Sequence, residues 1–192
     1  MRYVSIDDVP LSDAVETDID RRGLSDPLST TDVAINHYRL SPGDRMAGLH
    51  AHMDQEEVFI VIEGEATFET LNGEVTVSEE EVIRFPSGEF KGGKNESDSD
   101  LVIIALGAPH DTEDMRIPIA CPECNHADMR LVPREEGTTF VCPDCRAERV
   151  PIACSECDSD ALRITLDDKN QPVVVCLDCG TEFETPPVQD HW

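Results

Sequence analysis

Eight cysteines in the last third of the chain have the residue type and spacing that bind a metal. They form four CxxC pairs, and each pair can place two thiolates at one tight turn. The pairs combine into two sets with inner gaps at 125–141 and 158–175, and PIACPEC at 118–124 recurs as PIACSEC at 151–157. The sets are Cys121, Cys124, Cys142 and Cys145, then Cys154, Cys157, Cys176 and Cys179. A hairpin of this length returns the second turn to the first, so the spacing predicts two tetrahedral zinc sites.

Disulfide and redox chemistry are the competing explanations for these cysteines. A secreted disulfide scaffold normally begins with a signal peptide, whereas MRYVSIDDVPLSDAVETDID is acidic and has no apolar core. A thioredoxin-type CxxC would follow a strand in a longer α/β unit, which this cysteine-rich region lacks. We therefore predict two structural zinc ions. A closed four-thiolate site leaves no open position for a substrate.

A second group of metal ligands lies near the middle of the chain. His50 and His52 are two residues apart, so on a strand their side chains point to the same face. A carboxylate a few residues later, Glu57 or Glu56, would complete a set of two imidazoles and one oxygen. Such a set suits Fe(II), Mn(II), Ni(II) or Zn(II) and leaves coordination positions open. Neighbouring residues in a strand face opposite ways, so one of the two glutamates should point inward.

The segments that position these residues read as β-strands. Short β-branched runs are separated by turn signals such as SPGD, LNGE and PSGE, and no sustained 3.6-residue period is found in this region. The runs lie at 33–40, 57–64, 65–70, 74–78, 81–86 and 101–107. Many short strands at regular spacing predict an antiparallel barrel or jelly roll. The acidic residues 1–32 predict a loosely packed arm with one short strand.

Two segments carry a family resemblance. SPGDRMAGLHAHMDQEEVFIVIEGEA at 41–66 resembles the first motif of the cupin superfamily, and EEEVIRFPSGEFKGGKN at 79–95 resembles the second. The matching positions are Gly43, His50, His52, Glu57 and Gly64, then Pro86, Gly88 and Asn95. The resemblance selects Glu57 over Glu56 and implies a small β-barrel that holds any metal and substrate at its wide mouth.

The second motif departs from the resemblance at two positions. Lys91 stands where a third histidine is implied, and Glu80 stands where a glycine is implied. An ammonium must lose a proton before it can bind a metal. Lys91 could be displaced from a three-ligand metal centre or could pair with Glu57 in a barrel that binds a small molecule without metal. It could also be a solvated loop residue that never reaches the interior.

Composition limits the partners of the protein. The chain has 15 Lys and Arg against 41 Asp and Glu, a formal charge of −26, and it resembles haloarchaeal proteins in this respect. Residues 117–192 hold six basic and 15 acidic residues, a net of −9, which argues against nucleic acid and leaves a protein partner as the alternative. No apolar run reaches the ~20 residues of a membrane span, so we expect a cytoplasmic protein.

These observations predict an all-β chain: a small cupin-type β-barrel or jelly roll followed by two C-terminal zinc-ribbon β-hairpin modules. The expected units are an arm (1–32), the barrel (33–116), ribbon 1 (117–150), ribbon 2 (151–186) and a tail (187–192). Strand residue His37 is expected in the core or at the rim, His110 in a loop, and His126 and His191 in incidental positions.

Three functions stay open from sequence. The first is a small-molecule-binding sensor, adaptor or regulator with Lys91 contacting the ligand, in a homodimer. The second is a metal-dependent enzyme, a dioxygenase or isomerase, with a third divalent ion on His50, His52 and Glu57. The third is a nucleic-acid-associated ribbon protein that dimerises through its barrel.

Overall fold

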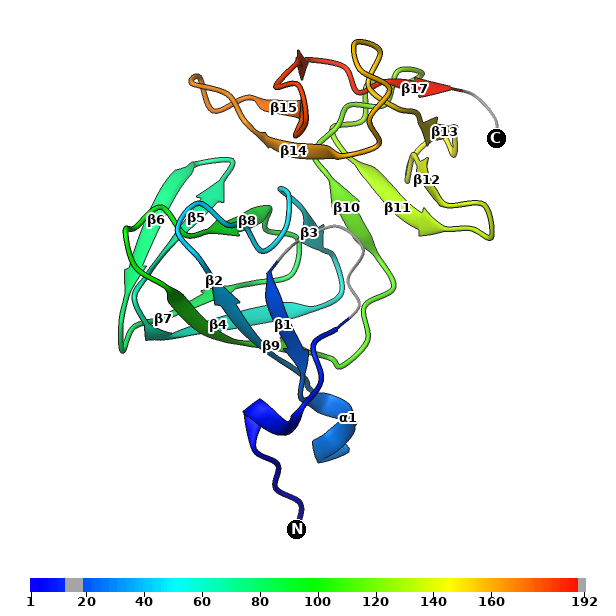
Figure 1. Ribbon diagram of the computed structural model, residues 1–192. Coiled ribbons are helices and arrows are strands. Elements are labelled where there is room, and N and C mark those ends of the chain that lie inside the picture. The colour runs from blue at the N-terminus through cyan, green and yellow to red at the C-terminus, as the bar shows by residue number, and fades with distance from the viewer. Residues whose placement is uncertain (13–18, 190–192) are drawn as a thin grey trace.

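The computed structural model describes residues 1–12 and 19–189 and is nearly all β, as the sequence predicts (Figure 1). Parts of the predicted arm and tail, including His191, lie outside the described residues. The helical elements described are the single turns η1 (Ile6–Asp8) and α1 (Ser25–Leu28). In the described ranges, no helix combines the length and the hydropathy needed to cross a bilayer.

Two facing sheets form the barrel. The first has the order β1-β2-β9-β4-β7 and the second β6-β5-β8. The strands of the first sheet are β1 (Asp20–Gly23), β2 (Ala34–Leu40), β9 (Leu101–Ala108), β4 (Glu56–Glu63) and β7 (Val82–Phe85). Those of the second are β6 (Gly73–Ser78), β5 (Glu65–Thr70) and β8 (Lys91–Lys94). The runs at 33–107 form strands as predicted, and the short arm strand is β1; β8 was not foreseen.

The core between the sheets is built from alternate residues of these strands. Phe59, Phe68 and Phe85 meet with ring centroids 5.0–5.9 Å apart, as expected of core aromatics. Leu40, Val61, Leu101 and Ile103 complete the buried centre. Because successive side chains on a strand point to opposite faces, this pattern also fixes which residues can reach the barrel interior.

Three positions of the two sequence motifs have clear backbone roles. Gly64 has φ +82°, and a Cβ there would overlap the carbonyl oxygen of Asp100. Glu80, at the position where a glycine is implied, adopts φ +65°, so this turn requires left-handed backbone. Asn95 is fully buried and donates hydrogen bonds to the carbonyls of Leu40 and Ser99 at 3.0 and 2.8 Å. These residues close the turns between strands.

Ribbon 1 is continuous with the barrel through one sheet. Its order is β17-β13-β12-β11-β10-β3, and β3 carries His52. The strands are β3 (Ala51–His52), β10 (Met115–Ile117), β11 (Met129–Pro133), β12 (Thr138–Val141), β13 (Glu148–Pro151) and β17 (Val188–Gln189). Met115 pairs with His52, and Arg116 pairs with Ala51. The expected boundary between residues 116 and 117 therefore falls inside β10.

Ribbon 2 lies over the outer side of the second barrel sheet (Figure 1). Its strands are β14 (Leu162–Leu166), β15 (Pro172–Cys176) and β16 (Glu182–Phe183). The backbone N–H of Leu49 donates to the carbonyl of Ile164 at 2.8 Å. The Thr165 hydroxyl donates to the buried carboxylate of Glu69 on β5 at 3.0 Å. The two ribbons thus contact the residues on either side of His50.

Candidate ligand and metal sites

Each ribbon gathers its four cysteines into one cluster. The Sγ atoms of Cys121 and Cys145 are 3.6 Å apart and those of Cys124 and Cys142 are 3.5 Å apart. Ribbon 2 repeats this at 3.6 and 3.5 Å for its pairs Cys154–Cys179 and Cys157–Cys176. Zn–S bonds of about 2.3 Å in a tetrahedron place sulfurs about 3.8 Å apart. The sulfurs are too distant for disulfides, which need about 2.05 Å, so both clusters could bind zinc.

The four CxxC turns share one hydrogen-bond pattern. In each, the residue after the second cysteine has positive φ, and its N–H donates to the carbonyl of the first cysteine at 2.8–3.1 Å. These residues are Asn125, Arg146, Asp158 and Gly180. In the last turn, the Thr181 hydroxyl lies 3.2 Å from the Cys179 sulfur. Hydrogen bonds from the Thr181 side chain and backbone lower the pKa of that thiol to about 6, which favours the thiolate that zinc binds.

In the barrel, His50, His52 and Glu57 converge. One ligand atom from each lies within 4.8 Å of the others, and the two imidazole rings meet edge to face at 5.0 Å. His52 Nε2 is 3.5 Å from Glu57 Oε2. Glu56, the alternative carboxylate, instead pairs with Arg84 and keeps 45% of its side chain exposed. Strand alternation separates the two glutamates as expected.

Lys91 lies inside this cluster. Its residue is 3% exposed, and its ammonium pairs with the Glu57 carboxylate. Lys91 and His50 also exchange two backbone hydrogen bonds, at 2.9 and 3.1 Å. The interpretation of Lys91 as a solvated loop residue is therefore wrong, because β8 places its side chain in the barrel beside the two histidines.

Burial and the lysine charge set the protonation of the cluster. Desolvation, followed by the Lys91 charge, lowers the pKa of His50 to about 4, so this imidazole is neutral at pH 7. The same two causes lower the pKa of His52. Burial lowers the pKa of Lys91 even though Glu57 opposes that shift. The three donor atoms fit a divalent metal, but a protonated Lys91 on the same carboxylate does not.

Both histidines are held through their Nδ1 atoms. His50 Nδ1 lies 2.8 Å from the carbonyl of Gly48. His52 Nδ1 lies 3.1 Å from the hydroxyl of Thr112, which donates to Asp54 Oδ1 at 2.7 Å. Sequence reasoning missed Thr112 and Asp54, because neither belongs to a recognisable ligand pattern.

The other described histidines, His37, His110 and His126, do not belong to this group of possible metal ligands. His37 is buried at 8% exposure, as expected for a core or rim position. His110 contacts exposed Asp111 at 2.8 Å in a loop, and His126 lies 3.5 Å from Asp128. In the sequence, the two-residue spacing of His50 and His52 was the feature that distinguished them from these other histidines.

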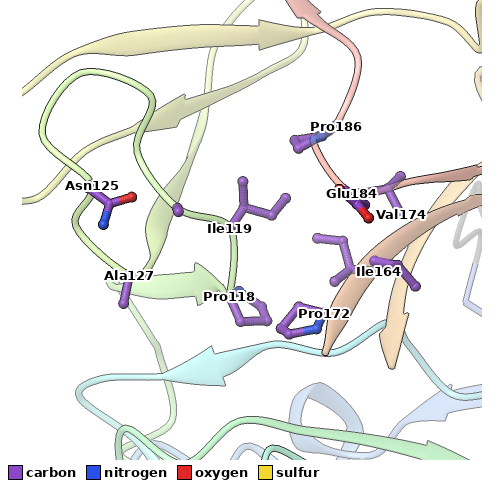
Figure 2. A pocket seen from close by; sticks show the side chains of 11 residues that line it. Pro118, Ile119, Asn125, Ala127, Ile164, Pro172, Val174, Glu184 and Pro186 are labelled. Atoms are coloured by element: carbon purple, nitrogen blue, oxygen red, sulfur yellow. The ribbon is translucent and has the colours of Figure 1, made fainter. Parts of the chain in front are cut away.

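Two hollows lie near these sites. One of about 340 Å³ separates the first turn of ribbon 1 from the sheet of ribbon 2, and Figure 2 shows its apolar lining with Asn125 and Glu184 among the polar exceptions. It contains no member of the barrel cluster. The other, of about 150 Å³, is bounded by Thr70 and Phe90 at the end of β5, next to the strand pair of Thr70 with Lys91. Neither hollow is lined by a residue of the barrel cluster.

Comparison with known proteins agrees with this architecture. The family model described as "Cupin domain" matches residues 36–107. This segment is similar to a cupin domain. It runs from within β2 to within β9, and the ribbon strands and Thr112 lie beyond it. No curated protein matches the chain in sequence.

Solved structures share the fold of the cupin domain at low identity. A sugar phosphate isomerase from Silicibacter pomeroyi, of a cupin superfamily, is 20% identical with a TM-score of 0.56; 74% of this chain and 94% of that chain are covered. A polyketide cyclase from Streptomyces resistomycificus is 20% identical with a TM-score of 0.53, covering 64% and 89%. A predicted oxalate decarboxylase from Thermotoga maritima is 19% identical with a TM-score of 0.50, covering 56% and 98%.

Proposed function

We propose that this protein binds a small anionic molecule in its cupin barrel and that both ribbons carry structural zinc. It would act as a sensor, adaptor or regulator. The observation that carries the proposal is the buried ammonium of Lys91 on Glu57, beside two imidazoles. One of its hydrogens engages Glu57, which leaves two donors for the oxygen atoms of a ligand.

The same ammonium opposes a metal in the barrel. A divalent ion bound by His50, His52 and Glu57 would share its carboxylate with the Lys91 cation. Like charges at such short range in a buried site repel strongly. A metal therefore requires Lys91 to lose its proton or to leave the cluster, and the lowered pKa of Lys91 makes that loss easier than in water.

Metal analysis of the full chain tests this proposal. The protein is loaded with zinc, exchanged into high salt and measured by elemental mass spectrometry, alone and after addition of Mn²⁺ or Ni²⁺. We expect two zinc ions in the wild type and one further divalent ion in Lys91→Met. That extra ion should disappear when His50→Ala is added. Lys169→Met, which changes a lysine of an exposed ribbon turn, should keep two ions.

Ligand binding is measured separately with small carboxylates and inorganic phosphate. We expect a stabilising thermal shift in the wild type that Lys91→Met loses and Lys169→Met keeps. A third metal in the wild type that depends on His50 would contradict the metal-free barrel. Equal ligand shifts in the wild type and Lys91→Met would contradict the role of Lys91.

A metal-dependent cupin enzyme is the second candidate. It is favoured by the convergence of the His50, His52 and Glu57 donor atoms, and structures of similar fold are described as isomerase, cyclase and predicted decarboxylase. This function would require both a barrel metal and turnover to vanish in His50→Ala. The homodimer, a protein partner at the ribbons, a halophilic source and a cytoplasmic location stay predictions.

A further inference from the structure

Hydrogen bonding fixes which nitrogen of His50 carries its proton. His50 Nδ1 lies 2.8 Å from the carbonyl oxygen of Gly48. A carbonyl can only accept, so Nδ1 must donate. In the neutral ring, Nε2 then carries the lone pair.

Hydrogen bonds through Thr112 and Asp54 fix which nitrogen of His52 carries its proton. The Thr112 hydroxyl donates its single hydrogen to Asp54 Oδ1 at 2.7 Å, so its oxygen is left to accept at 3.1 Å from His52 Nδ1. The second carboxylate oxygen of Asp54 accepts the backbone N–H of Glu113 at 2.8 Å. Asp54 is therefore engaged through both oxygens and holds Thr112 in one orientation. His52 then keeps its proton on Nδ1, and its Nε2 faces Glu57.

We propose that Thr112 and Asp54 are positioning residues that fix the Nδ1–H tautomer of His52, which leaves its Nε2 as an acceptor for a hydroxyl or amine hydrogen of a ligand whose anionic oxygens bind Lys91. Thr112 lies outside the matched cupin segment, in the connection from β9 to β10. This connection is itself tied to the histidine strand, since the Met53 N–H donates to the carbonyl of Asp114 at 2.8 Å. The start of the ribbon region thus completes the barrel site. The relevance of this tautomer to binding rests on the proposed function.

The tautomer can be read directly by ¹⁵N NMR of the His52 ring in the full zinc-loaded chain at neutral pH. In the wild type we expect Nδ1–H to dominate. Thr112→Val keeps the shape of the side chain but removes the hydroxyl. It should lower the ratio of Nδ1–H to Nε2–H by roughly 2- to 12-fold, the factor that corresponds to one ordinary hydrogen bond.

Three variants make this result specific. Thr112→Ser restores the hydroxyl and should restore the wild-type ratio. Asp54→Ala, at an exposed position, frees the hydroxyl to donate to Nδ1 and should shift the ratio in the same direction as Thr112→Val. Thr138→Val, on the exposed start of β12, should leave it unchanged. Folded Thr112→Val and Asp54→Ala proteins that both keep the wild-type ratio would overturn the proposal.

The measurement is independent of ligand binding. A tautomer shift in Thr112→Val, together with no binding of carboxylate or phosphate by the wild type, would support the positioning role and refute the proposed function. Ligand binding that depends on Lys91, together with an unchanged His52 tautomer in Thr112→Val, would support the proposed function and refute the positioning role.

Discussion

Replacement of Glu69 by glutamine should weaken the contact between ribbon 2 and the barrel more than any substitution at an exposed position. The Glu69 side chain is 5% exposed and accepts from Arg45 at 2.9 Å and from Thr165 of ribbon 2 at 3.0 Å. Lys94 lies 3.2 Å away but keeps Glu74 and Glu96 as partners. Glu69→Gln should therefore weaken mainly the interactions of this side chain with Arg45 and Thr165.

The expected magnitude follows from these contacts. Breaking one partner of a buried ion pair costs about 3–5 kcal/mol, and Arg45 reduces this because 23% of its side chain reaches water. We expect Glu69→Gln to lower the free energy of unfolding by about 2–3 kcal/mol, within the range for hydrogen bonds to charged groups. For a chain of this size, that corresponds to a fall in Tm of about 4–12 °C.

Urea unfolding followed by circular dichroism measures the change, with zinc and salt held constant. Glu65→Gln is the matched control, because Glu65 lies on the same strand, is exposed, and contacts the Ser78 hydroxyl at 3.3 Å. It should change stability by less than about 0.5 kcal/mol. A double-mutant cycle with Thr165→Val assigns the barrel–ribbon share. Equal effects of Glu69→Gln and Glu65→Gln would refute the reasoning.

The same carboxylate gives a pH dependence of known sign. Burial alone would raise the pKa of Glu69, but Arg45, Lys94 and Thr165 outweigh it and lower the pKa below its ordinary 4.5. The stabilisation is thus complete above pH 4.5 and is lost as pH falls through the folded-state pKa. The stability gap between wild type and Glu69→Gln should narrow in that acidic range and stay constant from pH 5 to 7.

Two further predictions concern the ribbons and one turn. Chelation of both zinc ions should unfold residues 117–192. Because the Leu49 N–H donates to the carbonyl of Ile164 in that region, amide hydrogen exchange should rise in peptides covering 48–53. Unchanged protection there would show that ribbon 2 does not stabilise this segment. Gly64→Ala should destabilise by more than about 2 kcal/mol, from left-handed strain plus overlap with the Asp100 carbonyl. Gly43→Ala, with φ +89° but open space, should cost only the strain, and similar losses in the two variants would contradict the overlap.

The parts that sequence predicted are those that depend on local spacing. Each CxxC turn is complete within about six residues, so the cysteines could be assigned to turns without coordinates. The choice of Glu57 over Glu56 followed from the two-residue period of a strand together with the motif. Six barrel strands, β2, β4, β5, β6, β7 and β9, were predicted because each contains a short β-branched or apolar run.

The parts that were missed depend on contacts between distant residues. β8 has the sequence KGGK, which has no apolar run, and its glycines allow close packing: a Cβ at Gly93 would overlap Met46 and lie 3.2 Å from Phe68. The inward direction of Lys91 follows from that packing. Thr112 reaches His52 across 60 positions of sequence, and no pattern within either segment signals the contact.

The pairing of β3 with β10 also sets an order of assembly. β3 has two residues, and its strand partner Met115 follows His52 by 63 positions (115 − 52). Closing so long a loop for so few backbone bonds is slow and entropically costly. During synthesis, the cupin segment to residue 107 leaves the ribosome before β10 and every cysteine. We therefore expect the pairing of β3 with β10 to form after the barrel core, so that zinc-depleted protein should keep the backbone hydrogen bonds between His50 and Lys91 but lose the pairing of His52 with Met115.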